Sequence, residues 1–429
     1  MNSLFKTVAI CLIFIISAGC SRTPEREIIH LLTKKYSNLY VNEPQKREAI
    51  NNLKEFLKEN HLSDQTYPKI QEYVHRINDG HVVLYRNDFM TKSTYESGLT
   101  FIPGSGYVMS CSTCTPAVAD GKYRILEIND IPLEKYLKAH ADSVAASTPS
   151  ARQFRILRTL SENHSPLEIR IKIQGVDKSL FTTSLNWQEV KPSTHRCVSG
   201  ERLDDKTFKL NIYSLWCDDK SNQKETRHEI LDRFKREFDN AAQNIHKDDF
   251  IILDLRENGG GGDQEVEYVL NSFSDKPLFI YRYKYLAVNT SQFKKWLARL
   301  SIHHADVWDK EEFLFTDPQN KTTYQFVDNK MITLVSEGCF SSCEGLASSL
   351  KLENRSLLMG STTHGGAGDP NVFPIKNSNF SLNIPTCLTW QKDGKLFEGT
   401  GVEPNIKMTQ NFVESSDTVL EESLKKVRE

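Results

Sequence analysis

One segment, DDFIILDLRENGGGGD at residues 248–263, restricts the possible folds more than any other part of the chain. Its first half is an almost continuous apolar run, which is typical of a strand buried on both faces. The segment KMITLVSEG, at residues 330–338, has the same character and leads directly into a helical pattern. Buried strands that alternate with helices predict an α/β core built on a largely parallel sheet.

The rest of the chain predicts further units around this core. A chain of 429 residues is too long for one core of ordinary size, so we expect two or three domains. Residues 25–57 and 67–77 have helical spacing of apolar side chains, and an Asp-Gly turn and a strand follow. Short strands with one helix are predicted for residues 98–187, and a polar helical tail for residues 412–429.

Composition excludes two broad classes of protein. With 38% hydrophobic and 26% charged residues, the chain is globular rather than disordered. The formal net charge is only -2, and no block of Lys and Arg is large enough to form a basic face. We therefore expect no nucleic acid partner.

The first twenty residues, MNSLFKTVAICLIFIISAGC, have the pattern of a secretion signal. The apolar stretch at residues 8–16 is too short to span a bilayer. The ending SAGC resembles a bacterial lipobox, although a serine stands at its first position. That ending would make Cys20 the lipidated first residue of the mature chain. We expect a lipid-anchored protein of the cell envelope, at the outer membrane or the periplasmic face; the alternative is plain cleavage near Gly19 and a soluble secreted protein.

Outside the cytoplasm, the cysteines are expected to pair. Setting aside Cys11 and Cys20, seven cysteines remain, so at least one is free or unusually paired. CSTC at residues 111–114 predicts a loop-closing disulfide or simple packing rather than a zinc site, because no second metal-binding half follows it. Cys339 and Cys343, four residues apart, either pair or pack.

The segment CFSSCEGLASSL, at residues 339–350, permits two interpretations. Ser341 and Glu344 have the S-x-x-E spacing of a capping box, in which a serine oxygen caps the first turn of a helix. Alternatively, the Ser341 hydroxyl attacks a substrate. A nucleophile of this kind needs a base, a group that orients the base, and donors for the oxyanion.

Several residues are candidates for these supporting roles. Residues 259–262 are four glycines after a buried strand, so they form either a tight turn or a pocket of N–H groups for an oxyanion. They lack the spacing of a nucleotide site. His81 and His364 are rival candidates for the base. Asp79 is expected to bond the backbone of its own turn rather than the His81 ring.

Four segments together resemble the C-terminal processing, or tail-specific, serine peptidases. They are FIILDLRENGGG, ITLVSEGCFSSCEGLASSL, LLMGSTTHGGAG and FEGTGVEPNI, in the order and approximate spacing of that family, from Lys206 to about Met408. Upstream, INDGHVVL is similar to the D-G-H segment of the family's tricorn-like branch, and YRILEINDIPLEKYL is similar to a strand of its PDZ-like domain.

The resemblance implies a role for individual residues. Ser341 would be the nucleophile, His81 the general base and Glu398 the carboxylate that orients the base. The backbone N–H groups of Ser342 and of Gly259 or Gly260 would form the oxyanion hole.

Two positions depart from the patterns of the family. Gly366 stands where the lysine-dependent branch has its base, which favours the histidine mechanism. Gly80 replaces a serine that helps to complete the relay in tricorn. No step of the implied mechanism calls for a metal or an organic cofactor.

The implied fold is α/β in a multidomain α+β arrangement, with a crotonase/ClpP-like α/β peptidase core. The implied boundaries are 1–20 for a lipoprotein signal peptide, 21–97 for a helical segment with the D-G-H motif, 98–190 for a PDZ-like domain, 191–411 for the serine peptidase core, and 412–429 for a C-terminal tail.

The resemblance implies a lipid-anchored serine endopeptidase that acts on proteins or peptides through an acyl-enzyme. One alternative is a surface lipoprotein of the same fold that binds peptide ends without cutting them. A second is a crotonase-like enzyme of acyl-group chemistry, against which the PDZ-like segment and the secretion signal argue.

Overall fold

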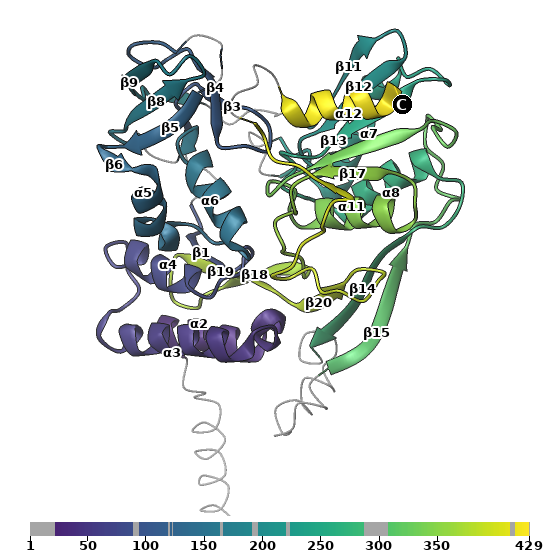
Figure 1. Cartoon of the computed structure of the whole chain (residues 1–429). Helices are drawn as coiled ribbons and strands as arrows, with labels where there is room; N and C mark the ends of the chain where they lie inside the picture. The colour runs from purple at the N-terminus through teal and green to yellow at the C-terminus, as the bar shows by residue number, and fades with distance from the viewer. Residues whose placement is uncertain are drawn as a thin grey trace, which may run out of the picture.

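The computed structural model describes most of the chain (Figure 1): residues 22–88, 94–118, 121, 123–163, 166–190, 196–219, 224–286, 308–411 and 417–428. The predicted signal peptide and the lipidation site at Cys20 lie outside these residues. Among the residues described, none of the helices combines the length and the apolar character needed to cross a membrane.

A six-stranded sheet forms the centre of the C-terminal half, in the order β11-β12-β13-β16-β17-β21. Strands β12 to β21 run parallel to their neighbours, and only β11 is antiparallel. The strands are β11 (Val198–Asp204), β12 (Thr207–Ile212), β13 (Phe250–Asp254), β16 (Met331–Val335), β17 (Leu357–Gly360) and β21 (Ile406–Lys407). The largely parallel sheet that the apolar runs predicted is therefore confirmed.

Helices cover both faces of this sheet. Ile251 and Leu253 of β13 are buried in a large core that also holds side chains of α7 (Arg227–Ala242), α8 (Asp263–Phe273) and α11 (Ser342–Leu352). Ile252, which points to the other face, packs with Val419 of the C-terminal helix α12 (Thr418–Arg428). Burial on both faces explains why β13 is an unbroken apolar run.

The N-terminal helices are joined to the C-terminal half through a shared sheet. The elements are α2 (Pro24–Lys34), η1 (Ser37–Tyr40), α3 (Glu43–Glu59), α4 (Tyr67–His75) and β1 (Val83–Arg86). Strand β1 pairs with β19 (Phe380–Pro385), which also pairs with β18 (Pro370–Pro374). Leu382 and Ile384 of β19 lie in one core with these helices. Figure 1 shows β19 beside β1. The C-terminal half therefore holds β1, and with it the preceding D-G-H turn, in place.

The middle of the chain forms a separate antiparallel sheet with its own core. Its strands are β3 (Leu99–Phe101), β4 (Tyr107–Cys111), β5 (Tyr123–Ile128), β6 (Ile131–Pro132), β8 (Arg170–Gly175) and β9 (Leu180–Ser184), and its helical segments are α5 (Leu133–Ala139), η3 (Ala141–Ser143) and α6 (Pro149–Arg158). The same part of the chain also forms a small sheet of β2 (Thr94–Glu96), β7 (Glu162–Asn163) and β10 (Gln188–Val190). A turn at Asn129-Asp130 joins β5 to β6, and both residues have positive φ.

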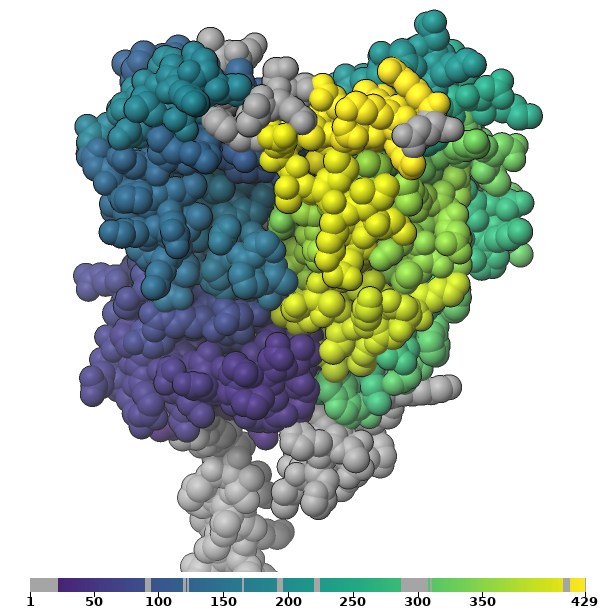
Figure 2. All heavy atoms as spheres, in the orientation of Figure 1, coloured from purple at the N-terminus to yellow at the C-terminus, as the bar shows by residue number. Residues whose placement is uncertain are grey.

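A further sheet, in the order β15-β14-β20, belongs to the C-terminal half. It consists of β14 (Phe279–Leu286), β15 (Trp308–Phe315) and β20 (Cys387–Trp390). In Figure 2, the C-terminal segments run down the visible face, between the N-terminal and middle parts on one side and the core on the other. The multidomain α/β fold expected from the sequence is confirmed.

Six of the seven cysteines beyond the predicted signal form disulfides. The pairs are Cys111–Cys114, Cys197–Cys217 and Cys339–Cys343, and Cys387 is free and buried. The structure thus resolves the alternative that the sequence left open at residues 339 and 343, because these cysteines are paired around the serine pair.

Candidate active site

Ser341 lies between the buried strand β16 and helix α11, at the residue before the helix begins. Its backbone has φ 58 and ψ -127, a left-handed conformation that costs a residue with a side chain of the order of 1–3 kcal/mol. The backbone is anchored by a hydrogen bond of 3.0 Å from the Ser341 N–H to the Gly366 carbonyl. Strain of this kind is typical of functional sites, and here it occurs at the predicted nucleophile.

The predicted capping box is wrong. The Ser341 side chain accepts no hydrogen bond from the first turn of α11. Glu344 is fully buried, and its carboxylate instead accepts hydrogen bonds from the Thr363 hydroxyl and from the N–H groups of Gly365 and Gly366. Burial raises the pKa of Glu344 to about 7, and these hydrogen bonds oppose the rise. Glu344 therefore fixes the loop that anchors Ser341 and leaves the serine hydroxyl free for another partner.

His81 is the hydrogen-bond partner of the Ser341 hydroxyl. Its Nε2 lies 3.1 Å from the Ser341 Oγ, although the two residues are 260 positions apart in the sequence. The ring is buried and stacks on Phe340, with 4.2 Å between the ring centroids. Burial lowers the pKa of His81 to about 4, with Asp79 opposing and Arg155 assisting the shift. At neutral pH the imidazole is therefore uncharged, as a group that accepts a proton must be.

His364, the rival candidate, does not contact the nucleophile. Its Nδ1 lies 3.1 Å from the Glu337 carbonyl, and its ring packs on Phe340 with 4.2 Å between the centroids. Its Nε2 is buried without a hydrogen-bond partner among the described residues. Burial holds the pKa of His364 well below its usual value, and Arg155 lowers it further. Of the two histidines, only His81 is bonded to Ser341.

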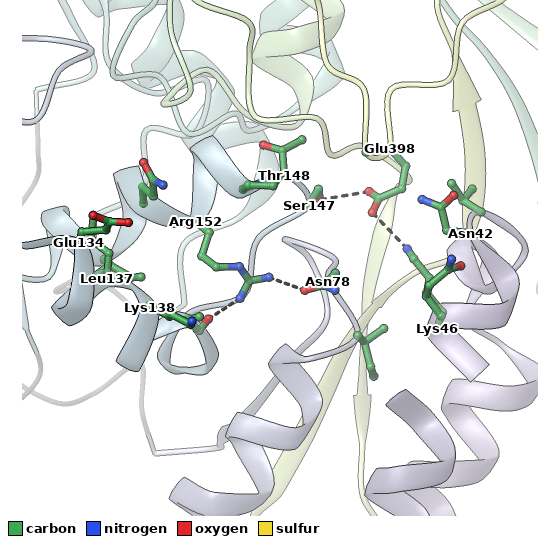
Figure 3. A pocket seen from close by; sticks show the side chains of 18 residues that line it. Asn42, Lys46, Asn78, Glu134, Leu137, Lys138, Ser147, Thr148, Arg152 and Glu398 are labelled. Carbon is green, nitrogen blue, oxygen red and sulfur yellow. Dashed lines mark hydrogen bonds and ion pairs between the residues drawn. The ribbon is translucent and has the colours of Figure 1, made fainter. Parts of the chain in front are cut away.

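Glu398, the predicted orienting carboxylate, reaches the base only indirectly. It makes no hydrogen bond to His81, whose Nδ1 is buried without a partner among the described residues. Ser147 links the two regions: its Oγ lies 3.2 Å from the Glu398 Oε2 and accepts a hydrogen bond of 2.9 Å from the N–H of Gly80. Figure 3 shows Glu398 between Ser147 and Lys46, at the edge of a cavity of about 670 Å³.

A buried charge cluster, which the sequence patterns did not indicate, surrounds Glu398. Lys46 Nζ lies 3.2 Å from Glu398 and 3.7 Å from Asp79. Burial and the charge of Asp79 raise the pKa of Glu398 to about 8, and Lys46 opposes the rise. Glu398 and Asp79 share the Lys46 cation in a buried site, so the charge of one carboxylate makes ionisation of the other less favourable.

Asp79 fixes the backbone that carries the base. Its Oδ1 accepts a hydrogen bond of 2.9 Å from the His81 N–H. Its Oδ2 accepts from the Tyr36 hydroxyl and from Asn38 at 2.8 and 3.0 Å. As the sequence predicted, Asp79 bonds its own turn, and the side chains of η1 and its neighbour hold that turn in place. No motif marks Lys46, Tyr36 or Ser147, because each lies far in the sequence from the carboxylate that it contacts.

The glycine turn packs directly against the serine. A Cβ on Gly260, which has φ 95, would lie 2.8 Å from the Ser341 Cβ and 2.6 Å from the Phe340 carbonyl oxygen, so no side chain fits there. The N–H of Gly260 is already bonded to the Asn258 Oδ1 at 2.8 Å. The N–H groups of Gly259 and Ser342 have no such partner among the described residues. Of the predicted oxyanion donors, Gly259 and Ser342 are therefore available in this structure, and Gly260 is not.

The Cys339–Cys343 disulfide closes a short loop around the serine pair. Both cysteines are fully buried, and the loop contains Phe340, on which the His81 ring stacks. The disulfide therefore restrains both the start of α11 and the surface against which the base packs.

A strained serine at a helix start, with an uncharged histidine at hydrogen-bonding distance, defines the site of a serine hydrolase. Residues 222–408 match the sequence model of peptidase family S41. Residues 222–408 therefore contain a domain of peptidase family S41, and the chain is a serine-type peptidase.

Solved structures share the fold over almost the whole chain. Mature CPAF superposes with a TM-score of 0.67 at 16% identity, covering 94% of this chain and 95% of CPAF. Mature CPAF complexed with lactacystin gives a TM-score of 0.66 at 14% identity, covering 94% and 96%. The similarity includes the N-terminal and middle regions, which lie outside the family match.

Proposed function

We propose that the chain is an endopeptidase that cleaves proteins or peptides through an acyl-enzyme formed on Ser341. The observation that carries this proposal is the 3.1 Å contact between the His81 Nε2 and the Ser341 Oγ. The two residues are 260 positions apart in the sequence, and their contact requires the N-terminal region to pack on the C-terminal half.

The proposed reaction has two halves. His81 accepts the Ser341 proton while Oγ attacks the peptide carbonyl, and the resulting imidazolium then protonates the leaving amine. A water molecule, deprotonated by His81, hydrolyses the ester and restores the serine. The N–H groups of Ser342 and Gly259 would hold the oxyanion in both halves, and loss of one such donor costs about a hundredfold or more in rate.

Several features favour an active enzyme over a peptide-binding relative that has lost its activity. Ser341 keeps the strained backbone, the base at hydrogen-bonding distance and a neighbouring N–H without a partner among the described residues. The family match likewise favours peptide substrates over the acyl-group chemistry of a crotonase-like enzyme.

The test combines covalent labelling with cleavage of a peptide library. Wild type should react with a serine-directed fluorophosphonate probe and cut library peptides. Ser341→Ala should do neither, and Ser342→Ala, which keeps the backbone N–H, should retain much of both activities. Absence of labelling and cleavage in folded wild type would leave only the peptide-binding alternative.

We also propose that the mature protein is anchored to the cell envelope by a lipid on Cys20. The three disulfides among the described residues support an oxidising compartment, where such bonds persist. Radiolabelled fatty acid should enter wild type and not Cys20→Ala, which should be found in the soluble fraction. Equal fractionation of both forms would contradict the anchor.

For the middle of the chain, residues 98–190, we retain the assignment to a PDZ-like domain. The antiparallel sheet with α5 and α6 supports it. The full-length Ser341→Ala protein should bind peptides with a free C-terminal carboxylate more tightly than their amidated forms, and equal affinity would remove this assignment.

A further inference from the structure

A second cavity, of about 480 Å³, opens beside the nucleophile. Ser341 and Ser342 form part of its wall, together with the end of the glycine turn, the first residue of α8, strands β14 and β20, and residues 367–370. Because Ser341 lines the cavity, a substrate side chain next to the attacked bond has direct access to it.

Two carboxylates lie in the wall of this cavity. Asp263 begins α8, and Asp369 follows the loop that anchors Ser341. Among the described residues neither aspartate forms an ion pair, and no Lys, Arg or His lines the cavity. Arg227, the cation that acts on Asp263, is itself paired with the buried Glu265. The cavity therefore carries an excess of negative charge.

The pKa of Asp263 reflects this imbalance. Desolvation, together with the charges of the neighbouring Asp369 and Glu265, raises this pKa to about 6, and Arg227 opposes the rise. Asp369 is held in place by the Tyr285 hydroxyl, which donates a hydrogen bond of 2.9 Å to the Oδ2. A bound cation would relieve both the repulsion and the incomplete solvation.

Two residues of this wall carry buried hydroxyls. Thr389 and Ser342 both line the cavity, and the Thr389 Oγ1 and the Ser342 Oγ are buried without a hydrogen-bond partner among the described residues. The exposed fractions of these residues are 7% and 4%. A buried hydroxyl without a partner costs about 1–3 kcal/mol, so a ligand with N–H donors would satisfy both groups.

Aromatic rings form another wall. Tyr281, Tyr283 and Tyr285 alternate along β14, so they share one face of the strand, and all three line the cavity. Tyrosine faces attract ammonium and guanidinium groups and also pack against the methylene stems of Lys and Arg. The cavity thus offers a contact for the stem and a contact for the charge of one long cationic side chain.

We propose that this cavity binds the side chain of a Lys or Arg residue adjacent to the scissile bond, so that the enzyme cleaves next to basic residues. The inference rests on the proposed peptidase function. It adds the class of side chain that selects the bond, and Asp263 and Asp369 are the residues that determine this specificity.

The test uses matched peptides and matched variants of the full chain. Peptides that are cut should carry Lys or Arg beside the cleaved bond, on the side that mass spectrometry of the products identifies. Replacing that residue by norleucine, which keeps the stem and removes the charge, should lower kcat/KM by about tenfold or more. Asp263→Asn and Asp369→Asn should each reduce this preference, and the double variant should nearly remove it.

The controls separate charge recognition from general damage. On the norleucine peptide the variants should lose much less activity than on the Lys or Arg peptide, because no charge pair is lost there. Asp275→Asn changes an exposed aspartate just after the same helix and should alter neither rate. The ratio of the two rates should be the same with and without EDTA.

Three results would overturn the inference: cleavage with no preference for Lys or Arg, equal losses on both peptides in the aspartate variants, or a preference that EDTA changes, which would assign the cavity to a metal ion. A different result, in which wild type neither cuts any peptide nor reacts with the fluorophosphonate probe, would contradict the proposed function instead.

Discussion

The two halves of the active site are built in different ways. The nucleophile half consists of Ser341, the glycine turn and the loop held by Glu344. These segments follow neighbouring strands of one sheet. The base half brings His81 and Lys46 from the N-terminal region, Ser147 from the middle region and Glu398 from the C-terminal region. The first half is a property of the sheet, and the second exists only when separate regions pack together.

This difference explains what the sequence revealed. Motifs of contiguous residues identified Ser341, the glycine turn and the buried strands. His81 was found through a short D-G-H segment, and geometry then separated it from His364. Lys46 and Ser147 carry no local pattern, because only the packing of η1, α3 and the segment before α6 makes them neighbours of Glu398. Glu344 was seen but misinterpreted, since the spacing of a capping box does not reveal which groups a buried carboxylate will meet.

The largest expected effect in the base half is the loss of the base itself. His81→Gln should lower kcat/KM for peptide cleavage by about 10² to 10⁴-fold, the usual contribution of a general base. His364→Gln, a matched change that leaves the Ser341 contact intact, should cost much less. Steady-state kinetics on one peptide compare the two variants. A larger loss of kcat/KM in His364→Gln would indicate that His364, and not His81, is the base.

In the nucleophile half, the most sensitive position after Ser341 itself is Gly260. Gly260→Ala places a Cβ against Ser341 and Phe340 at a residue with φ 95. Displacement of the reacting atoms should lower kcat by about a hundredfold or more. Gly394→Ala is the control, because Gly394 also has positive φ but a Cβ added there would meet no atom within 4 Å. Similar kcat values for both variants would refute the close packing.

The indirect link to Glu398 should contribute less. Ser147→Ala removes one hydrogen bond to Glu398 and one to Gly80, and should lower kcat by about three- to tenfold with KM nearly unchanged. Ser147→Thr should restore part of the rate, because it keeps the hydroxyl. A change in KM alone, or no rescue by threonine, would show that Ser147 acts only on the structure.

The loop held by Glu344 should be visible in stability. Glu344→Gln replaces an acceptor of three hydrogen bonds by an amide and should reduce the free energy of unfolding by about 1–3 kcal/mol. Glu48→Gln, at an exposed position of α3, should change it by at most a few tenths. Urea unfolding measures the stability of both variants. Equal stabilities of Glu344→Gln and Glu48→Gln would contradict the anchoring role of Glu344.

The two halves should also differ in their response to pH. Because burial lowers the pKa of His81 to about 4, protonation of the base should lower kcat as the pH drops through about 4. Asp263, with a pKa of about 6 and facing Asp369, Glu265 and Arg227, loses its charge at a higher pH. KM for a Lys peptide should therefore rise as the pH falls through about 6, with no such change for the norleucine peptide. A single transition shared by kcat and KM would contradict this separation.

The most direct test of the central claim is to map the fluorophosphonate adduct by mass spectrometry. At neutral pH the wild-type protein should carry one adduct, on Ser341, and labelling should be slower in His81→Gln by a factor comparable to its loss of peptide cleavage. An adduct on another residue, or labelling of Ser341 at an unchanged rate without His81, would contradict the account.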